Sequence, residues 1–142
     1  MAEPFAHRMR VRYVECDALG VVFNAHYLSY MDQTITELFR AGFGGYRRLL
    51  DSGLDMAVAE ARIRFRSPAR FDEEIDLEAT VAHIGTTSLI TDHRLRRDGE
   101  LLIEGRLVHI WVQRATTVKT AIPDWARTGL NRWYEPGTDH RG

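Results

Sequence analysis

The spacing of hydrophobic residues changes along the chain from a helical pattern to a strand pattern. From about Ala25 to Ala41, apolar side chains recur at intervals that place them on one helical face: Leu28, Met31, Ile35, Leu38 and Phe39. Asn24 is a good N-cap for this helix, and Gly42 is a good C-terminal stop. Tyr27 and Tyr30 widen the apolar stripe, so the pattern predicts a long helix that is largely buried.

After this helix, hydrophobic and polar residues alternate, which predicts four antiparallel strands. They are expected at residues 61–66, 74–81, 88–96 and 101–113. Asp98-Gly99 separates the last two strands and is a strong signal for a tight hairpin turn. Residues 7–16, rich in Val, Tyr and Arg, predict one more strand before the helix, and residues 44–53 predict a short second helix.

The order of elements is therefore strand, long helix, short helix and four strands. A sheet with one apolar face needs a cover, and the long helix is the only predicted element large enough to provide it. We therefore predict an α+β protein in which an antiparallel β-sheet wraps around one long central α-helix. Because an open sheet has unpaired edges, this protein is expected to self-associate.

Composition and charge exclude several classes of protein. The 142 residues, 44% of them hydrophobic, predict a single folded domain spanning 1–142, with a polar C-terminal tail at 135–142 that is expected to fray. A net charge of −1 gives no electrostatic reason to expect nucleic acid or a membrane surface as a partner. Neither a signal peptide nor a run of about 18 apolar residues is evident, so we expect a cytoplasmic protein without membrane insertion.

Cys16 is the single cysteine, which excludes an intrachain disulfide and a cysteine-rich metal site. The histidines outside the candidate site show no ligand spacing, so no metal is predicted: His7, His83, His93, His109 and His140. Cys16 could form a nucleophilic pair with His26. However, alternation along a strand would turn Cys16 away from a site that Asp17 faces, which favours a buried structural thiol.

Asp17 is the strongest candidate for chemistry. It ends a strand-like segment, and Gly20 and the helix start at Asn24 follow within a few residues. This order can place a carboxylate beside the exposed amides of a helix N-terminus, an arrangement suited to attack on a carbonyl group. The alternative is that Asp17 merely stabilises a turn, which is a common use of aspartate before glycine.

The run Asp17-x-x-Gly20-Val21-Val22-Phe23, followed by Tyr27 and a helix, resembles the hotdog-fold 4-hydroxybenzoyl-CoA thioesterases and their YbgC-like acyl-CoA thioesterase relatives. Residues 63–69 and 84–89 resemble later strands of the same family, and the similarity covers roughly 8–125. The resemblance implies a hotdog fold, a core at about 8–125, and hydrolysis of an acyl-CoA thioester to a free carboxylic acid and coenzyme A.

The resemblance also implies roles for individual residues. Asp17 would be the nucleophile or general base, and the backbone N–H near Asn24 would bind the thioester oxygen. Gly20 and His26 complete the expected catalytic set, although the family often places a histidine before the asparagine, whereas here His26 follows Asn24. In the first turn of a helix, His26 is expected to be neutral. The expected substrate contacts are Val22, Phe23, Tyr27, Arg64, Gly85, Thr86 and Ser88.

The resemblance places this site at the subunit interface of a homodimer or homotetramer, and it implies no cofactor beyond the coenzyme A of the substrate. Two other functions stay open. One is a hotdog dehydratase or hydratase, which would use Asp17 and His26 as an acid–base pair. The other is a non-catalytic acyl-CoA-binding hotdog protein.

Alternating charges on two predicted strands also have two interpretations. Arginines alternate through the first strand and acidic residues through the second: Arg62, Arg64 and Arg66, then Glu74, Asp76 and Glu78. If these strands form a hairpin, the two stripes are cross-strand ion pairs, which is the favoured interpretation. The alternative is that the arginines, Arg64 above all, bind the phosphates of coenzyme A. Likewise, Gly85–Ser88 is either a plain turn or a segment beside the pantetheine chain.

Overall fold

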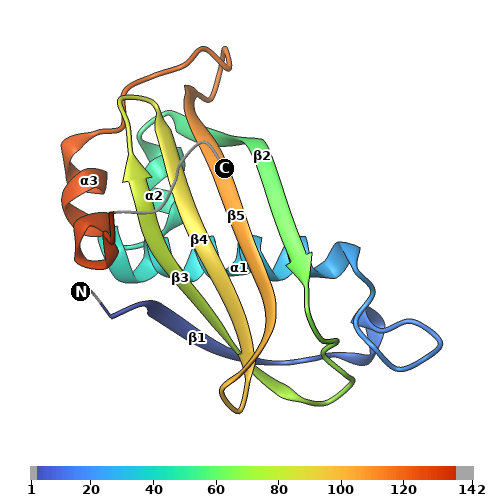
Figure 1. Ribbon diagram of the computed structural model, residues 1–142. Coiled ribbons are helices and arrows are strands. Elements are labelled where there is room, and N and C mark those ends of the chain that lie inside the picture. Colours follow the sequence, from blue (N-terminus) through green and yellow to red (C-terminus); the bar gives the residue numbers. More distant parts are fainter. Residues whose placement is uncertain (1–2, 137–142) are drawn as a thin grey trace.

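In the computed structural model, which describes residues 3–136, five antiparallel strands form one sheet in the order β1-β3-β4-β5-β2. The strands are β1 (Phe5–Arg10), β2 (Leu54–Phe65), β3 (Glu74–Ile84), β4 (Ser88–Arg97) and β5 (Glu100–Gln113). The helices are α1 (Ala25–Phe43), α2 (Tyr46–Asp51) and α3 (Asp124–Leu130), with short 3₁₀ turns at Tyr13–Glu15 and Asn131–Trp133. Figure 1 shows α1 crossing behind the sheet.

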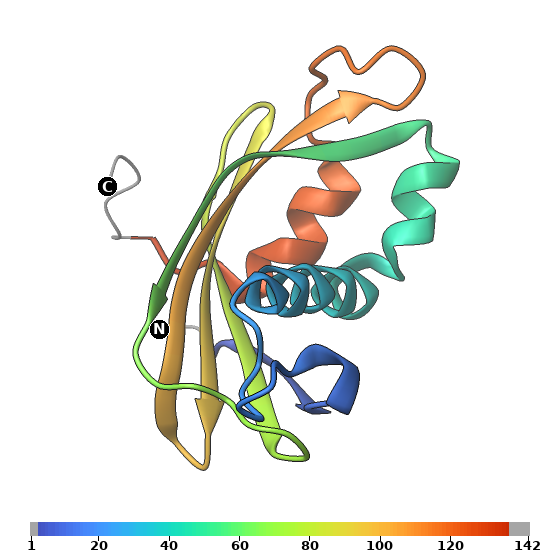
Figure 2. The same cartoon turned by 90° about the vertical axis from the view of Figure 1, so that its right-hand side faces the viewer.

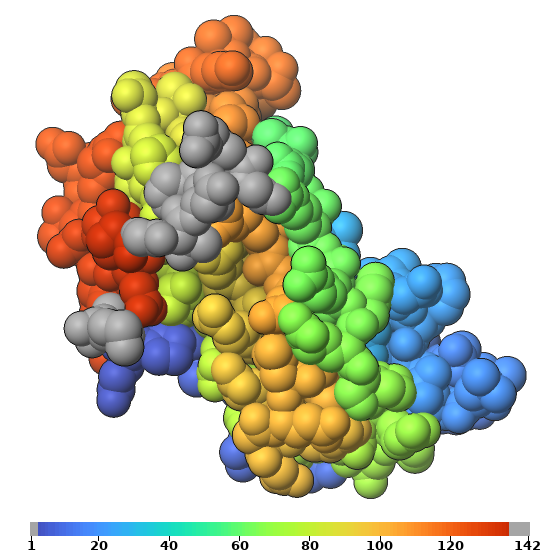
Figure 3. Space-filling model, in the orientation of Figure 1, coloured from blue at the N-terminus to red at the C-terminus, as the bar shows by residue number. Residues whose placement is uncertain are grey.

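The sheet curls around α1, and α1, α2 and α3 all lie on the same side of it (Figure 2). The side chains of α1 that face the sheet are at most 2% exposed: Tyr30, Met31, Ile35, Leu38 and Phe39. They belong to the same core cluster as Leu77, Leu95 and Trp111 of the strands. Figure 3 shows the outer face of the sheet, and in the ribbon views none of the three helices lies on this face. The predicted α+β hotdog arrangement is therefore confirmed.

The long helix begins after Asn24, as predicted, but ends two residues later than expected. Gly42 lies inside α1, and the C-cap is Gly44, whose φ of 96° is left-handed and whose N–H bonds to the carbonyls of Arg40 and Phe39. Gly42 instead allows α3 to approach closely, because a Cβ at Gly42 would lie 3.0 Å from the carbonyl oxygen of Gly129. Helix packing, rather than helix termination, therefore requires glycine at position 42.

The first strand is shorter than predicted. β1 ends at Arg10, and residues 13–15 form a 3₁₀ turn instead of continuing the strand to Cys16. The cause is local, because the carboxylate of Glu15 accepts a hydrogen bond of 2.8 Å from the backbone N–H of Arg12 and closes the turn. By contrast, Asp98 and Gly99 have φ values of 49° and 82°, and they join β4 to β5 as the predicted tight hairpin.

The predicted hairpin between the strands at 61–66 and 74–81 is wrong. β2 pairs with β5, and β3 lies between β1 and β4, so two strands separate β2 from β3. The arginine and acidic stripes therefore find other partners. Arg66 binds Glu104 at 2.7 Å, Glu74 and Asp76 pair with arginines of β1, and Glu78 pairs with Arg96. Charge alternation identified the strands but not their neighbours.

The core extends beyond the predicted limit of residue 125. Helix α3 packs against the C-terminal end of α1. Three side chains of α3 and the turn after it are at most 4% exposed: Ala126, Leu130 and Trp133. Helix α3 was not predicted from the sequence, although Asp124 directly after Pro123 is an ordinary helix-start signal. Of the predicted polar tail, residues 137–142 lie outside the described residues. Within residues 3–136, no helix is long and apolar enough to span a membrane.

Candidate active site

The segment between Cys16 and Asn24 forms a closed loop at the N-terminal end of α1, visible as the blue loop in Figure 1. Cys16 and Val22 form an antiparallel bridge, and the N–H of Asp17 donates to the carbonyl of Val21 at 2.9 Å. The N–H of Gly20 closes the turn by bonding to the carbonyl of Asp17 at 3.0 Å. Gly20 has a φ of 78°, so this turn requires the glycine that the sequence places there.

The side chain of Asp17 is exposed and held in one orientation. Its Oδ1 accepts a hydrogen bond of 2.9 Å from the N–H of Leu19, which is an Asx-turn. Its other oxygen, Oδ2, makes no hydrogen bond within the described chain. The turn-stabilising interpretation of Asp17 is therefore correct for one oxygen, and the second oxygen is left available for chemistry.

The start of α1 presents unpaired amides. Asn24 has helical φ and ψ angles of −54° and −33°, and its side chain makes no capping hydrogen bond. The first N–H of this turn with a backbone acceptor is that of His26, which bonds to the carbonyl of Phe23 at 2.9 Å. Within residues 3–136, the N–H groups of Asn24 and Ala25 have no acceptor. Two amides at the positive end of a 19-residue helix can therefore accept a developing negative charge.

Glu15 stabilises this arrangement and was not predicted from the sequence as a residue of the site. Only 6% exposed, its carboxylate accepts hydrogen bonds from the backbone and guanidinium of Arg12 and from the hydroxyl of Tyr30, while its carbonyl accepts the N–H of Phe23. Burial acts to raise the pKa of Glu15, but these hydrogen bonds outweigh burial and leave it below its ordinary value. The sequence signal was a glutamate three residues after Arg12, whose carboxylate returns to the Arg12 N–H as in one half of a capping box.

A cavity of about 240 Å³ brings several predicted site residues together beside the helix start. Its walls include Val22, Asn24, Tyr27 and Phe65. The hydroxyl of Tyr27 accepts the N–H of Ala69 at 3.0 Å, and its ring meets that of Phe65 with centroids 5.7 Å apart. Because Phe65 is 54% exposed, one wall of this cavity lies open at the surface of the chain.

Phe23 and His26 lie next to each other at the same end of α1. Their rings meet edge to face, with centroids 6.2 Å apart, and Phe23 is 51% exposed. No contact joins His26 to Asp17 within the described residues. An acid–base pair of the kind that a dehydratase needs is therefore not formed in this chain.

The structure separates the remaining predicted residues from Asp17. Gly85, Thr86 and Ser88 form the β3–β4 turn, which lies beside α3 at the far end of α1 in both ribbon views. Nineteen residues of α1 correspond to about 28 Å, so one chain cannot bring this turn to its own Asp17. Arg64 lies on the outer face of the sheet near Glu104, because its neighbour Ile63 packs against the core.

Cys16 has the environment of a structural thiol. It is half-buried, and its Sγ donates to the carbonyl of Arg12 at 3.6 Å. Burial raises the pKa of Cys16, and the nearby charges of Glu15 and Asp17 raise it further. Both effects keep the group as a thiol, which supports the structural interpretation over a cysteine nucleophile.

An antiparallel sheet wrapped around one helix, with a carboxylate loop at the start of that helix, defines a hotdog-fold protein. A family model described as the thioesterase-like superfamily matches residues 11–130, and the chain belongs to this family. The predicted enzyme class, a thioester hydrolase, is therefore confirmed.

Named relatives and solved structures agree with this family. The chain is 25% identical over 120 residues to the acyl-CoA thioester hydrolase YbgC of Escherichia coli O6:H1, covering 84% of this chain and 90% of the relative. It is 26% identical over 122 residues to the putative acyl-CoA thioesterase YneP of Bacillus subtilis, covering 82% and 88%. A hypothetical protein from Thermus thermophilus superimposes with a TM-score of 0.83 at 30% identity, covering 90% of this chain and 98% of that one.

Proposed function

We propose that this protein hydrolyses an acyl-CoA thioester to a free carboxylic acid and coenzyme A, with Asp17 as the reacting carboxylate. The observation that carries the proposal is the arrangement of the Cys16–Asn24 loop. It sets an exposed carboxylate with an uncommitted Oδ2 at the same end of α1 as the unpaired amides of Asn24 and Ala25. The names of the relatives YbgC and YneP supply the acyl-CoA substrate.

The thioester oxygen would bind at the amides of Asn24 and Ala25, where the helix dipole stabilises the negative charge of the tetrahedral intermediate. Asp17 then has two chemically balanced routes. As a nucleophile, it attacks the carbonyl carbon and expels the coenzyme A thiolate, and water hydrolyses the resulting mixed anhydride. As a general base, it takes a proton from water, whose oxygen attacks the same carbon, and the tetrahedral intermediate then breaks its C–S bond and releases coenzyme A, whose thiolate takes up a proton. Neither route needs a cofactor.

A second copy of the chain would complete the site. β2 is an edge strand, and from Ala57 to Arg62 every residue is exposed. Apolar side chains stand open around it and along the first turns of α1: Phe23, Leu28, Val58 and Phe65. Pairing of this edge between two copies would bury these side chains and form a homodimer, from which a homotetramer could be built. The Gly85–Ser88 turn would then reach the Asp17 of the other copy.

Thiol release tests this proposal. We expect the protein to release free thiol from at least one member of a panel of aromatic, short-chain and long-chain acyl-CoAs, followed with a chromogenic disulfide reagent. Asp17→Asn keeps the Oδ1 acceptor for Leu19 but removes the charge, and it should lower kcat by about a hundredfold or more. Asp51→Asn is the matched control, because the side chain of Asp51 at the end of α2 is exposed, and it should retain full activity.

Two results would overturn parts of this proposal. If no acyl-CoA releases thiol, the hydrolase function is wrong. If Asp17→Asn retains the wild-type rate, the function stands but the assignment of the carboxylate is wrong.

A further inference from the structure

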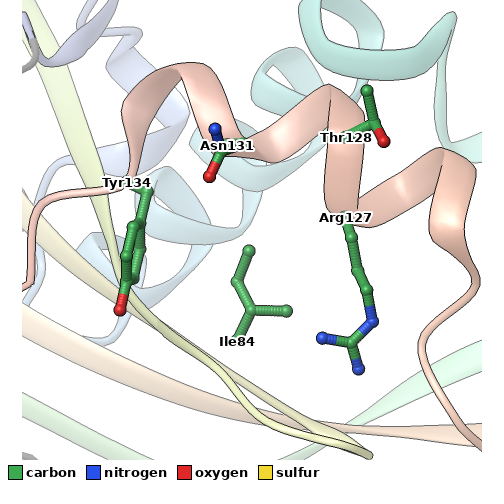
Figure 4. A pocket seen from close by; sticks show the side chains of 5 residues that line it. All are labelled: Ile84, Arg127, Thr128, Asn131 and Tyr134. Atoms are coloured by element: carbon green, nitrogen blue, oxygen red, sulfur yellow. The ribbon is translucent and has the colours of Figure 1, made fainter.

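A polar cavity of about 460 Å³ lies between β3 and the segment formed by α3 and the 3₁₀ turn after it (Figure 4). In the ribbon views this segment lies at the opposite end of α1 from the loop that carries Asp17. The walls of the cavity are Ile84 of β3 and Arg127, Thr128, Asn131 and Tyr134 of the C-terminal segment. The polar groups on these walls are a guanidinium, an amide and two hydroxyls. We call this cavity the Arg127 pocket. None of its described lining residues is a carboxylate, so no negative charge on its walls balances that of Arg127.

The guanidinium of Arg127 is fixed but not neutralised. Its Nε donates to the carbonyl of Ile122 at 3.0 Å, and its Nη2 donates to the carbonyls of Gly85 at 2.6 Å and Thr86 at 3.3 Å. Its Nη1 has no acceptor, and no ion pair involves Arg127 among residues 3–136. Carbonyl oxygens orient a guanidinium without cancelling its charge, so Arg127 remains a full cation at the edge of the pocket.

Other arginines of comparable burial are paired with carboxylates. Arg97 binds Glu73 at 2.8 Å and Glu100 at 2.6 Å, and Arg106 binds Asp92 at 2.7 Å. A half-buried arginine without a carboxylate in a pocket of hydrogen-bond donors has the features of an anion site.

We propose that the Arg127 pocket binds a phosphate group. A phosphate offers several acceptor oxygens, which match the free Nη1 of Arg127. The amide of Asn131 and the hydroxyl of Tyr134 on the other walls are further donors for the rest of the ligand. The volume of about 460 Å³ exceeds that of a single phosphate and has room for part of a nucleotide. The identity of the ligand rests on the proposed function, in which the phosphates are those of the nucleotide end of coenzyme A.

The position of the pocket agrees with this ligand. Arg127 bonds directly to Gly85 and Thr86, so the pocket adjoins the turn that is expected to contact the pantetheine chain. Gly85 leaves the turn tightly closed, because a Cβ there would lie 2.6 Å from the Oγ of Ser88 and 3.0 Å from the Nε2 of His83. One extended substrate would then place its thioester at Asp17 of one copy and its phosphates in the Arg127 pocket of the other copy.

Kinetics with truncated substrates test the proposal. We expect Arg127→Gln to raise the KM for acyl-CoA about tenfold with little change in kcat, which is the usual size of a lost charged hydrogen bond. The same variant should leave the KM for the matching S-acyl-pantetheine unchanged, because that substrate carries no phosphate. Arg132→Gln is the matched control, since Arg132 is exposed on the adjoining turn and stacks on Trp133. It should leave both KM values unchanged.

Two other kinetic results would contradict the phosphate site. If Arg127→Gln raises the KM for acyl-CoA and for S-acyl-pantetheine equally, Arg127 only positions the Gly85–Thr86 turn and the phosphate site is wrong. If Arg132→Gln has the same effect as Arg127→Gln, the effect is one of general charge and the site is again wrong.

Direct binding separates this inference from the proposed function. In isothermal titration calorimetry, 3′,5′-ADP should bind the wild-type protein and bind Arg127→Gln about tenfold more weakly, with inorganic phosphate as a second, weaker probe. Failure of thiol release together with Arg127-dependent binding of 3′,5′-ADP would reject the hydrolase but keep the phosphate site. Thiol release from acyl-CoA with no binding of 3′,5′-ADP would keep the hydrolase and reject the phosphate site.

Discussion

The hydroxyl of Tyr30 donates a buried hydrogen bond of 2.9 Å to the carboxylate of Glu15. Tyr30 lies in the second turn of α1, whereas Glu15 stands two residues before Asp17, so this bond connects the central helix to the loop that carries the candidate catalytic acid. Glu15 raises the pKa of Tyr30 in turn, after the larger effect of burial. The position of Asp17 relative to the helix start therefore depends on a contact outside the site itself.

Removal of the Tyr30 hydroxyl should show how much the Tyr30–Glu15 hydrogen bond stabilises the folded protein. We expect Tyr30→Phe to lower the free energy of unfolding by about 1–3 kcal/mol, because the buried carboxylate of Glu15 loses a donor. Urea denaturation measures this loss. Tyr13→Phe is the matched control, since Tyr13 is 77% exposed, and it should be nearly neutral. Equal losses in the two variants would contradict a special role for the Tyr30–Glu15 bond.

Glu15 should also make the protein sensitive to strong acid. Its pKa is lower in the folded chain than in the unfolded chain, so its contribution to stability is present above the unfolded value of 4.5 and is lost as the pH falls through the folded value. Unfolding measured from pH 6 down to pH 3 should show a steeper loss in the wild type than in Glu15→Gln. Parallel curves would show that Glu15 carries no such linkage.

His93 should lower the stability of the folded protein at mildly acidic pH. Burial is the largest cause that lowers its pKa, to about 3, and the charge of neighbouring His109 adds to this effect. Below pH 6.5 the unfolded chain binds a proton at His93 and the folded chain does not, so stability should fall as the pH drops from 6.5 towards 3. His93→Gln keeps a partner for Thr91 but cannot titrate. It should flatten the stability curve between pH 6.5 and 5, and an unchanged slope there would contradict this assignment.

Cys16 should be dispensable for catalysis. Its raised pKa and its hydrogen bond to Arg12 leave it a thiol with no role in the proposed mechanism. We expect Cys16→Ala to change kcat and KM for acyl-CoA by less than about twofold, within the small effect of a partly exposed substitution. Loss of activity in a variant that remains folded by circular dichroism would restore the hypothesis of a cysteine nucleophile.

The close crossing of α1 and α3 should tolerate no side chain. A Cβ at Gly129 would overlap the carbonyl oxygen of Gly42 and lie 3.2 Å from the Cβ of Phe43. We therefore expect Gly129→Ala to destabilise the protein by about 1–3 kcal/mol, as overpacking does. Thermal denaturation measures this effect, and Ala41→Ser on the exposed side of α1 is the control. A stable Gly129→Ala would mean that the two helices can move apart at little cost.

The sequence alone was sufficient for the features that depend on local pattern. The apolar stripe of α1, the alternation of β3, β4 and β5, and the Asp98-Gly99 hairpin turn were all predicted, because each is a property of residues close together in the chain. The short run around Asp17 also indicated the family, and the match of the family model over residues 11–130 confirmed it.

Tertiary structure decided what depends on distant residues. Charge alternation is satisfied by any oppositely charged neighbour, so the sequence could not show that Arg66 meets Glu104 of β5 and not an acidic residue of β3. Gly42 fits a helix stop as well as it fits a helix crossing, and only the approach of Gly129 distinguishes the two. Only the fold brought Arg127 to the carbonyls of Gly85 and Thr86, across about forty residues of chain. Local pattern thus determined the elements and the family of this protein, whereas packing of distant residues determined strand neighbours, helix crossings and the surroundings of its candidate sites.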